Sequence, residues 1–205
     1  MLLFGRRRLS VGCRLWAGCC LVAVGATVRR VVLIRGPGID LSPAEMLGDA
    51  AGLDVVSAGN LFREHVERGT PIGARASDLM RAGELVPDAL AVDAVAGALA
   101  GVAHGWVLSG FPTTVDQAAL LTARGHLPDT VIELALVEAE LDQNPRLAAQ
   151  REHIDLVLPH YHERVEPLRR YYAARSAFHV VSGTGHREAV GAALVAIVAR
   201  GPEGR

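Results

Sequence analysis

A glycine-containing turn near residue 36 is the first place in this chain where residue types and spacing point to chemistry. The apolar residues 31–34 are followed by Gly36-Pro37-Gly38, and a helix-like segment opens at Ser42 or Pro43. A strand, a tight turn and a helix in this order are typical of a phosphate-binding loop, in which backbone N–H groups and the helix dipole face phosphate oxygens. Gly36 and Gly38 are therefore candidate nucleotide-binding residues.

The charged chemistry of such a loop is missing from this sequence. Arg35 stands where the loop would begin with Gly, Asp40 stands at an inner Gly, and Leu41 stands at the Lys. All 21 basic residues of the chain are Arg, so no Lys can contact phosphate anywhere. Arg35 and Arg151 are the candidate substitutes for that charge, but a bulky Arg35 at a tight turn is expected to block phosphate, and Asp40 to repel it. We predict a loop that keeps the backbone shape of a phosphate-binding loop but lacks the side chains that bind phosphate.

Composition limits the kind of protein that can carry this loop. The chain has 205 residues, 50% hydrophobic and 4% aromatic, with a formal net charge of −1. That length suits one domain of about 180 residues with a terminal extension. The balanced charge gives no reason to expect a nucleic-acid surface. We expect a cytoplasmic, monomeric domain that has neither a nucleic-acid partner nor a membrane partner and binds a nucleotide.

Residues 1–28 differ from the domain expected over residues 29–205. They contain no acidic residue, a cluster at Arg6-Arg7-Arg8, all three cysteines and an uncharged run from Leu15 to Ala26. A translated upstream region, a signal or transit peptide and a membrane-proximal tail all fit this composition. The uncharged run is shorter than the roughly 20 residues that a membrane-spanning helix needs. The remaining domain has no Cys and therefore no catalytic thiol.

Strands and helices alternate along the rest of the chain. Short apolar runs predict five strands, near residues 31–34, 53–57, 106–108, 130–136 and 178–182. Helical patterns lie between them, near residues 43–51, 58–69, 70–82, 87–103, 112–124, 138–150, 151–175 and 186–200. A break is expected at Asn144-Pro145. This alternation predicts an α/β fold with a parallel sheet, which binds ligands at the carboxyl ends of its strands.

Several segments, in unbroken order over about residues 29–200, resemble the adenylate kinase family. The segment VSAGNLFREHVERGTPIGARASDLMRAGELVPDAL is similar to the family's monophosphate-binding helices, and SGFPTTVDQA resembles its D-G-F-P-R signature. The later segments VEPLRRYY and VSGTG also match family motifs. The resemblance implies a three-layer P-loop nucleoside-triphosphatase-like fold, with a five-stranded parallel sheet, helices on both faces and a short lid.

The resemblance assigns roles to residues of the monophosphate site. Arg63 matches the family Arg that binds the monophosphate group, and a guanidinium suits bidentate phosphate contact. Gly59 matches a Gly that lets a helix N-terminus approach the nucleotide, and Gly110 matches the Gly of the D-G-F-P-R signature.

The adenine pocket is matched in the same way. Leu85 and Val86 match the pair that lines it, and Gln117 matches the Gln that bonds the adenine edge. The resemblance therefore implies a largely present pocket for AMP or ADP.

The residues that differ from the family motifs are those that the family uses for phosphoryl transfer. Besides Leu41, Thr113 replaces the Arg of the signature, Ser109 replaces its Asp, and Pro43 replaces a hydroxyl that helps at the metal. Arg146 is matched to one lid Arg and is the candidate catalytic residue. The family neutralises the moving phosphoryl group with Lys, Arg and Mg²⁺.

Two functions follow from these matches. The first is a nucleotide-binding or regulatory pseudoenzyme that keeps the monophosphate pocket, which we favour. The second is a divergent kinase that converts ATP and AMP to two ADP, and only this function requires ATP with Mg²⁺.

Three histidines of one predicted helix, His153, His160 and His162, are not expected to bind a metal, because His160 and His162 are two residues apart and face different sides.

Overall fold

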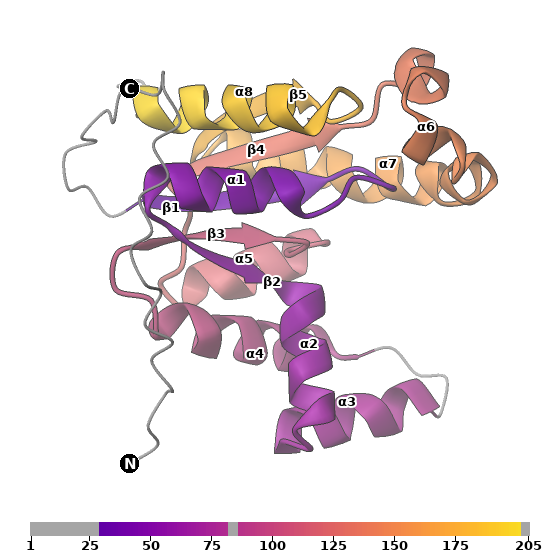
Figure 1. The fold of residues 1–205 in the computed structure, drawn as a ribbon. Coiled ribbons are helices and arrows are strands. Elements are labelled where there is room, and N and C mark those ends of the chain that lie inside the picture. The colour runs from indigo at the N-terminus through magenta and orange to yellow at the C-terminus, as the bar shows by residue number, and fades with distance from the viewer. Residues whose placement is uncertain (1–28, 82–85, 202–205) are drawn as a thin grey trace, which may run out of the picture.

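A five-stranded sheet forms the centre of the molecule. The computed structural model describes residues 29–81 and 86–201, and Figure 1 shows the arrangement of their elements. All strand pairs are parallel, in the order β2-β3-β1-β4-β5. The strands are β1 (Arg29–Arg35), β2 (Asp54–Ser57), β3 (Gly105–Ser109), β4 (Thr130–Ala135) and β5 (Ala177–Ser182). The predicted parallel α/β fold is therefore confirmed.

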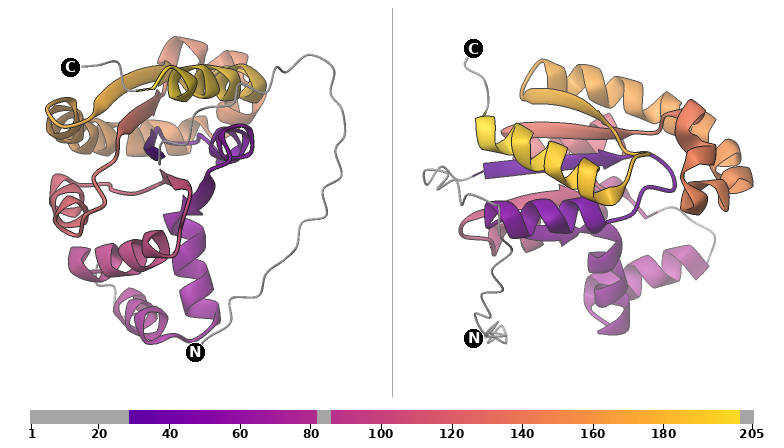
Figure 2. Two further views of the ribbon diagram at one scale, coloured as in Figure 1. Left: turned by 90° about the vertical axis from the view of Figure 1, so that its left-hand side faces the viewer. Right: turned by 45° about the horizontal axis from the view of Figure 1, so that its top comes forward.

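Helices cover both faces of this sheet. They are α1 (Ser42–Ala51), α2 (Ala58–Glu67), α3 (Pro71–Arg81), α4 (Asp88–Ala100), α5 (Val115–Ala123), η1 (Glu138–Gln143), α6 (Pro145–Ala148), α7 (Arg151–Ala173) and α8 (Arg187–Arg200). Helices α1 and α8 lie on one face, and α4, α5 and α7 lie on the other, as the edge-on view in Figure 2 shows. Helices α2 and α3 project from the sheet beyond β2.

Strand β1 shows why the sheet is buried on both sides. Successive side chains of a strand point to opposite faces. Val32 accordingly packs with the α4, α5 and α7 side, and Leu33 with the α1 and α8 side, each 0% exposed. An unbroken apolar run is what a central parallel strand requires, because neither of its faces meets water.

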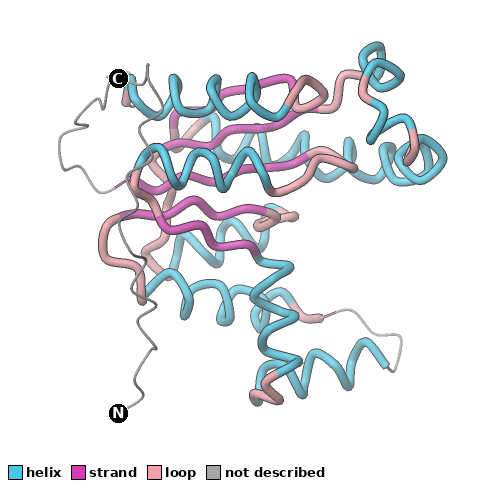
Figure 3. The backbone as a smooth tube through the Cα atoms, viewed as in Figure 1, coloured by secondary structure: helices cyan, strands magenta, loops and turns pink. Residues whose placement is uncertain are grey.

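The strands all end at the same edge, where the loops of the candidate site lie (Figure 3). Residues 36–41 follow β1, and residues 110–114 follow β3. The helix predicted after the Gly110-Phe111-Pro112 turn begins at Val115, because the Thr114 hydroxyl accepts a hydrogen bond from the Gln117 N–H and caps α5 there. This cap keeps residues 110–114 as an open loop.

A short segment stands where the lid was expected. The predicted helix 138–150 is divided at Asn144 into η1 and α6, and the Asn144 side chain accepts a hydrogen bond from Arg146 N–H at 3.1 Å. Leu141, Leu147 and Ile154 form a small buried cluster beneath it. A Cβ added to Gly38 would lie 2.9 Å from both Leu147 and Ile154, so this segment packs directly against the loop after β1.

Some expectations fall outside the described residues. The extension over residues 1–28 and the adenine-pocket candidate Leu85 both lie there. Over the ranges 29–81 and 86–201, no helix is both long enough and apolar enough to span a bilayer.

Candidate functional site

The loop after β1 has the shape predicted for a phosphate-binding loop. Gly36 N–H donates to the Leu134 carbonyl at 2.9 Å, and a Cβ on Gly36 would come within 3.2 Å of the β4 backbone. Gly38 has a φ of +77°, which a glycine adopts without strain. The chain then enters α1 at Ser42, with Pro43 in the first helical turn. Gly36 and Gly38 thus form the expected turn, while their contact with a nucleotide stays a prediction.

The protein's own charges occupy this loop. The Asp40 carboxylate accepts a hydrogen bond from Ser42 N–H at 3.2 Å, at the start of α1. Arg146 binds the same carboxylate through Nη1 at 2.6 Å and donates from Nη2 to the Gly38 carbonyl at 2.8 Å. A helix N-terminus attracts anions, and here a side-chain carboxylate already lies at it. Arg146 therefore reaches the loop with an internal acid as its partner, and its match to a lid Arg stays a prediction.

Arg35 lies across the base of the loop. Its Nη1 donates to the Ile39 carbonyl at 2.7 Å, and its Nη2 lies 3.3 Å from where a Cβ on Gly110 would stand. Burial lowers the pKa of the guanidinium, and the nearby Asp40 carboxylate partly offsets that effect. The side chain thus extends from the end of β1 toward the loop after β3.

The side of the site that is predicted to bind a monophosphate is more open. Gly59 and Gly110 are both exposed, and a Cβ on Gly59 would meet nothing within 4 Å. Arg63 is an exposed side chain of α2 that folds back on its own helix, donating to the Gly59 carbonyl at 3.3 Å and to the Asn60 side chain. A ligand phosphate can replace these local contacts without exposing a buried group.

Gln117 is buried, and both polar atoms of its side chain are already bonded. Its Oε1 accepts hydrogen bonds from Thr113 N–H at 2.8 Å and from the Thr113 hydroxyl at 3.0 Å. Its Nε2 donates to Asp88 of α4 at 2.7 Å. Half-buried Val86 comes shortly before that helix. Sequence analysis assigned Asp88 no role beyond starting a helix, whereas in the structure Asp88 is the partner that orients Gln117.

A second polar network joins the lid segment to the end of β5 and the loop after it. A cavity of about 270 Å³ is lined by Asp40, Arg146 and the loop after β5. There, Glu140 accepts hydrogen bonds from Ser182 at 3.0 Å and from Thr184, and these bonds lower the pKa of the Glu140 carboxyl. Apart from the VSGTG match to Ser182 and Thr184, sequence reasoning assigned none of this network.

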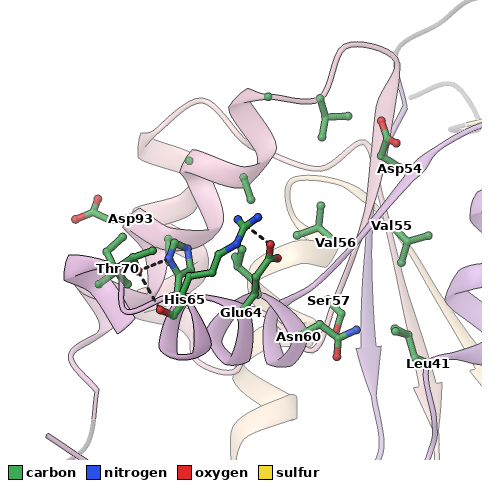
Figure 4. Close-up of a pocket in the computed structure, with 18 of the residues that line it drawn as sticks. Leu41, Asp54, Val55, Val56, Ser57, Asn60, Glu64, His65, Thr70 and Asp93 are labelled. Carbon is green, nitrogen blue, oxygen red and sulfur yellow. Dashed lines mark hydrogen bonds and ion pairs between the residues drawn. The ribbon is translucent and has the colours of Figure 1, made fainter. Parts of the chain in front are cut away.

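A larger cavity, of about 880 Å³, lies elsewhere (Figure 4). It is bounded by β2, α2 and α4, and on α2 it is lined by Asn60, Leu61, Glu64, His65 and Arg68. At 3.6 residues per turn these positions share one face of α2, and Arg63 lies to one side of that face, next to Asn60. Its described lining contains none of the predicted nucleotide-binding residues, so size alone does not locate the site.

Fold and loop together define a class of protein. A parallel sheet of order β2-β3-β1-β4-β5, with a strand, a glycine turn and a helix at its central strand, is the P-loop nucleoside-triphosphatase-like architecture. The family model for adenylate kinase matches residues 38–177.

Curated relatives agree with this match. An adenylate kinase of Nitrobacter winogradskyi is 33% identical over 181 residues, covering 75% of this chain and 85% of the relative. One of Mesorhizobium japonicum is 30% identical over 203 residues, covering 86% and 100%. One of Mycolicibacterium smegmatis is 34% identical over 154 residues, covering 70% and 85%. The chain belongs to the adenylate kinase family.

Proposed function

We propose that this protein binds a nucleoside monophosphate and has lost, or retains only weakly, the transfer of a phosphoryl group from ATP to AMP. The observation that carries this proposal is the ion pair of Asp40 with Arg146 inside the phosphate loop, at 2.6 Å. It sets a carboxylate beside the backbone N–H groups that would receive the phosphates of ATP. AMP or ADP is the proposed ligand, and a monomer in the cytoplasm is the proposed form.

The triphosphate side does not fit ATP with Mg²⁺. Leu41 packs against the apolar core between α1 and α8 and carries no charge. Pro43 offers no hydroxyl, and Ser109 is fully buried with no carboxylate to hold a metal's water shell. Mg²⁺ prefers carboxylates and phosphate oxygens, and Asp40 is already shared by Arg146 and Ser42 N–H.

The rate that is lost with the missing charged side chains favours an impaired enzyme. Removing one preorganised charge-stabilising donor typically costs about 2.7–4 kcal/mol, or a hundred- to a thousandfold in rate. Such losses are not additive when the groups act together. Even so, losing both the Lys at position 41 and the Arg at position 113 removes most of the transition-state stabilisation that the family uses.

The alternative is a divergent but active kinase. Its support is that Arg35 and Arg146 bring two guanidinium groups to the loop. In that function the two arginines replace the missing Lys, and ATP enters with Mg²⁺ after the Arg146–Asp40 pair opens.

Replacing Arg63 tests the retained pocket. Arg63→Ala is expected to weaken AMP binding at least about tenfold, because a charge-assisted contact to phosphate is lost. Arg68→Ala is the matched control, since Arg68 is an exposed arginine at the end of α2 that pairs with Glu64 beside the other cavity. Calorimetric titration with AMP measures both. The assignment of Arg63 fails when Arg63→Ala binds AMP as the wild type does, and the proposed function fails when the wild type does not bind AMP.

A further inference from the structure

Two neighbouring polar side chains at the carboxyl edge of the sheet have unsatisfied atoms. Within the described residues, Arg35 Nε and the Ser109 hydroxyl are buried and have no hydrogen-bond partner. Buried polar atoms almost always have a hydrogen-bond partner, so an unpaired one indicates a position where a further group binds. Both residues lie at the ends of adjacent strands, where open α/β sheets bind their ligands.

Strand register places these two residues on the same face. Leu33 of β1 is the partner of Ser109 of β3, and Arg35 is two residues further along β1. Leu33 and Val107 both pack on the α1 and α8 side of the sheet. Because side chains alternate, Arg35 and Ser109 also point to that side.

The charge of Arg35 is poorly compensated. Among the described residues its guanidinium makes one hydrogen bond, from Nη1 to the neutral carbonyl of Ile39. Asp40 is the acid near it, but that carboxylate is shared by Arg146 and Ser42 N–H. A partly buried cation without a bonded anion is costly, and an anionic ligand removes that cost.

One edge of the guanidinium, formed by the buried and unpaired Nε and by Nη2, has the geometry that binds two oxygens of one anion. With Nη1 bound to Ile39, Nε and Nη2 remain, and these two donors are parallel and suit two oxygens of one phosphate. Nη2 lies beside Gly110, which is exposed and has a φ of +80°. Since Gly110 has no side chain, a ligand can approach Nη2 past it.

We propose that Arg35 binds the phosphate of the monophosphate ligand through Nε and Nη2, with the Ser109 hydroxyl as a neighbouring donor. This proposal rests on the proposed function for its ligand, a phosphate monoester. The family signature has an Arg at the position of Thr113. In this proposal, Arg35 at the end of β1 supplies that positive charge instead. The side chain that fills the base of the phosphate loop thereby serves the monophosphate instead.

The test compares AMP, adenosine and inorganic phosphate on the full chain. Arg35→Gln removes the charge, Arg35→Lys keeps it, and Arg170→Gln is the control, an arginine 78% exposed on α7. Calorimetry measures AMP and adenosine binding, and ³¹P NMR titration measures inorganic phosphate. Arg35→Gln is expected to weaken AMP about ten- to a hundredfold, the range for a charge-assisted contact. Adenosine affinity is expected to be unchanged, Arg35→Lys to retain part of the AMP affinity, and Arg170→Gln to match the wild type.

Two results overturn the proposal about Arg35. One is AMP binding by Arg35→Gln within twofold of the wild type; the other is an equal loss of AMP and adenosine affinity, which indicates a structural role. If the wild type binds inorganic phosphate but not AMP, the proposed function fails, and loss of phosphate binding in Arg35→Gln still supports a phosphate site at Arg35. Binding of neither ligand by the wild type overturns both.

Discussion

Arg169→Ala is expected to lower the free energy of unfolding by about 3–5 kcal/mol, because it leaves a buried charge without its partner. Glu133 of β4 is 0% exposed. Arg169 binds both of its oxygens, Nε to Oε2 at 2.6 Å and Nη2 to Oε1 at 2.7 Å, and the Tyr161 hydroxyl donates to Oε1 at 3.0 Å. The hydrogen bonds to Glu133 are the main reason why the pKa of Arg169 is raised above its usual value.

The neighbouring residue provides the control for this change. Arg170 pairs with Glu166 at 3.2 Å, but its side chain is 78% exposed, so Arg170→Ala is expected to cost at most about 1 kcal/mol. Urea unfolding followed by circular dichroism measures both variants. The double variant Glu133→Leu with Arg169→Met is expected to recover most of the loss, because no charge is then stranded. An equal loss of unfolding free energy in Arg169→Ala and Arg170→Ala would show that the buried Glu133–Arg169 pair stabilises the fold no more than an exposed pair.

Gly73→Ala is expected to disrupt the hairpin of α2 and α3 and to abolish tight AMP binding. A Cβ on Gly73 would lie 2.0 Å from the His65 carbonyl oxygen, which is backbone and cannot move aside. Gly73 N–H also donates to the Thr70 hydroxyl at 3.1 Å, which in turn bonds the His65 ring at 2.8 Å. Overpacking at such a contact costs about 1–3 kcal/mol or more. The displaced α2 carries Arg63 away from the site.

Gly97→Ala is the matched change for Gly73. Gly97 lies within α4 on the large cavity, and a Cβ there would meet nothing within 4 Å. Ala is a better helix former than Gly, so this variant is expected to be more stable by up to about 1 kcal/mol and to bind AMP normally. Thermal unfolding and AMP calorimetry measure both variants. Normal AMP affinity in Gly73→Ala would refute the close packing of α2 on α3.

The fold was predictable because its signals are local. Residues 31–34 give an apolar strand, Gly36-Pro37-Gly38 gives the turn, and Pro43 starts the helix. The family motifs then fixed the order of the elements, which the sheet order and the family match confirm. Sequence also showed that Leu41 cannot act as the loop Lys.

The contacts of the site could not be predicted in the same way. The Arg146–Asp40 pair joins residues 106 positions apart, and nothing in the local sequence says that the lid Arg binds an internal acid. The direction of Arg35 depends on the Ile39 carbonyl and on the missing side chain at Gly110, which are tertiary features. For Gln117, the sequence gives the position but not its bond to Asp88.

A coupled assay with ATP, Mg²⁺ and AMP tests most directly whether the phosphate loop has lost the handling of ATP. Arg63→Ala, prepared in parallel, controls for a contaminating kinase, whose rate would be the same in both samples. We expect no ADP formation above that background, and none in Leu41→Lys, because Arg35, Thr113 and the Asp40–Arg146 pair remain. Wild-type turnover above a few per second that falls in Arg63→Ala, or a robust kinase from Leu41→Lys alone, would contradict this expectation.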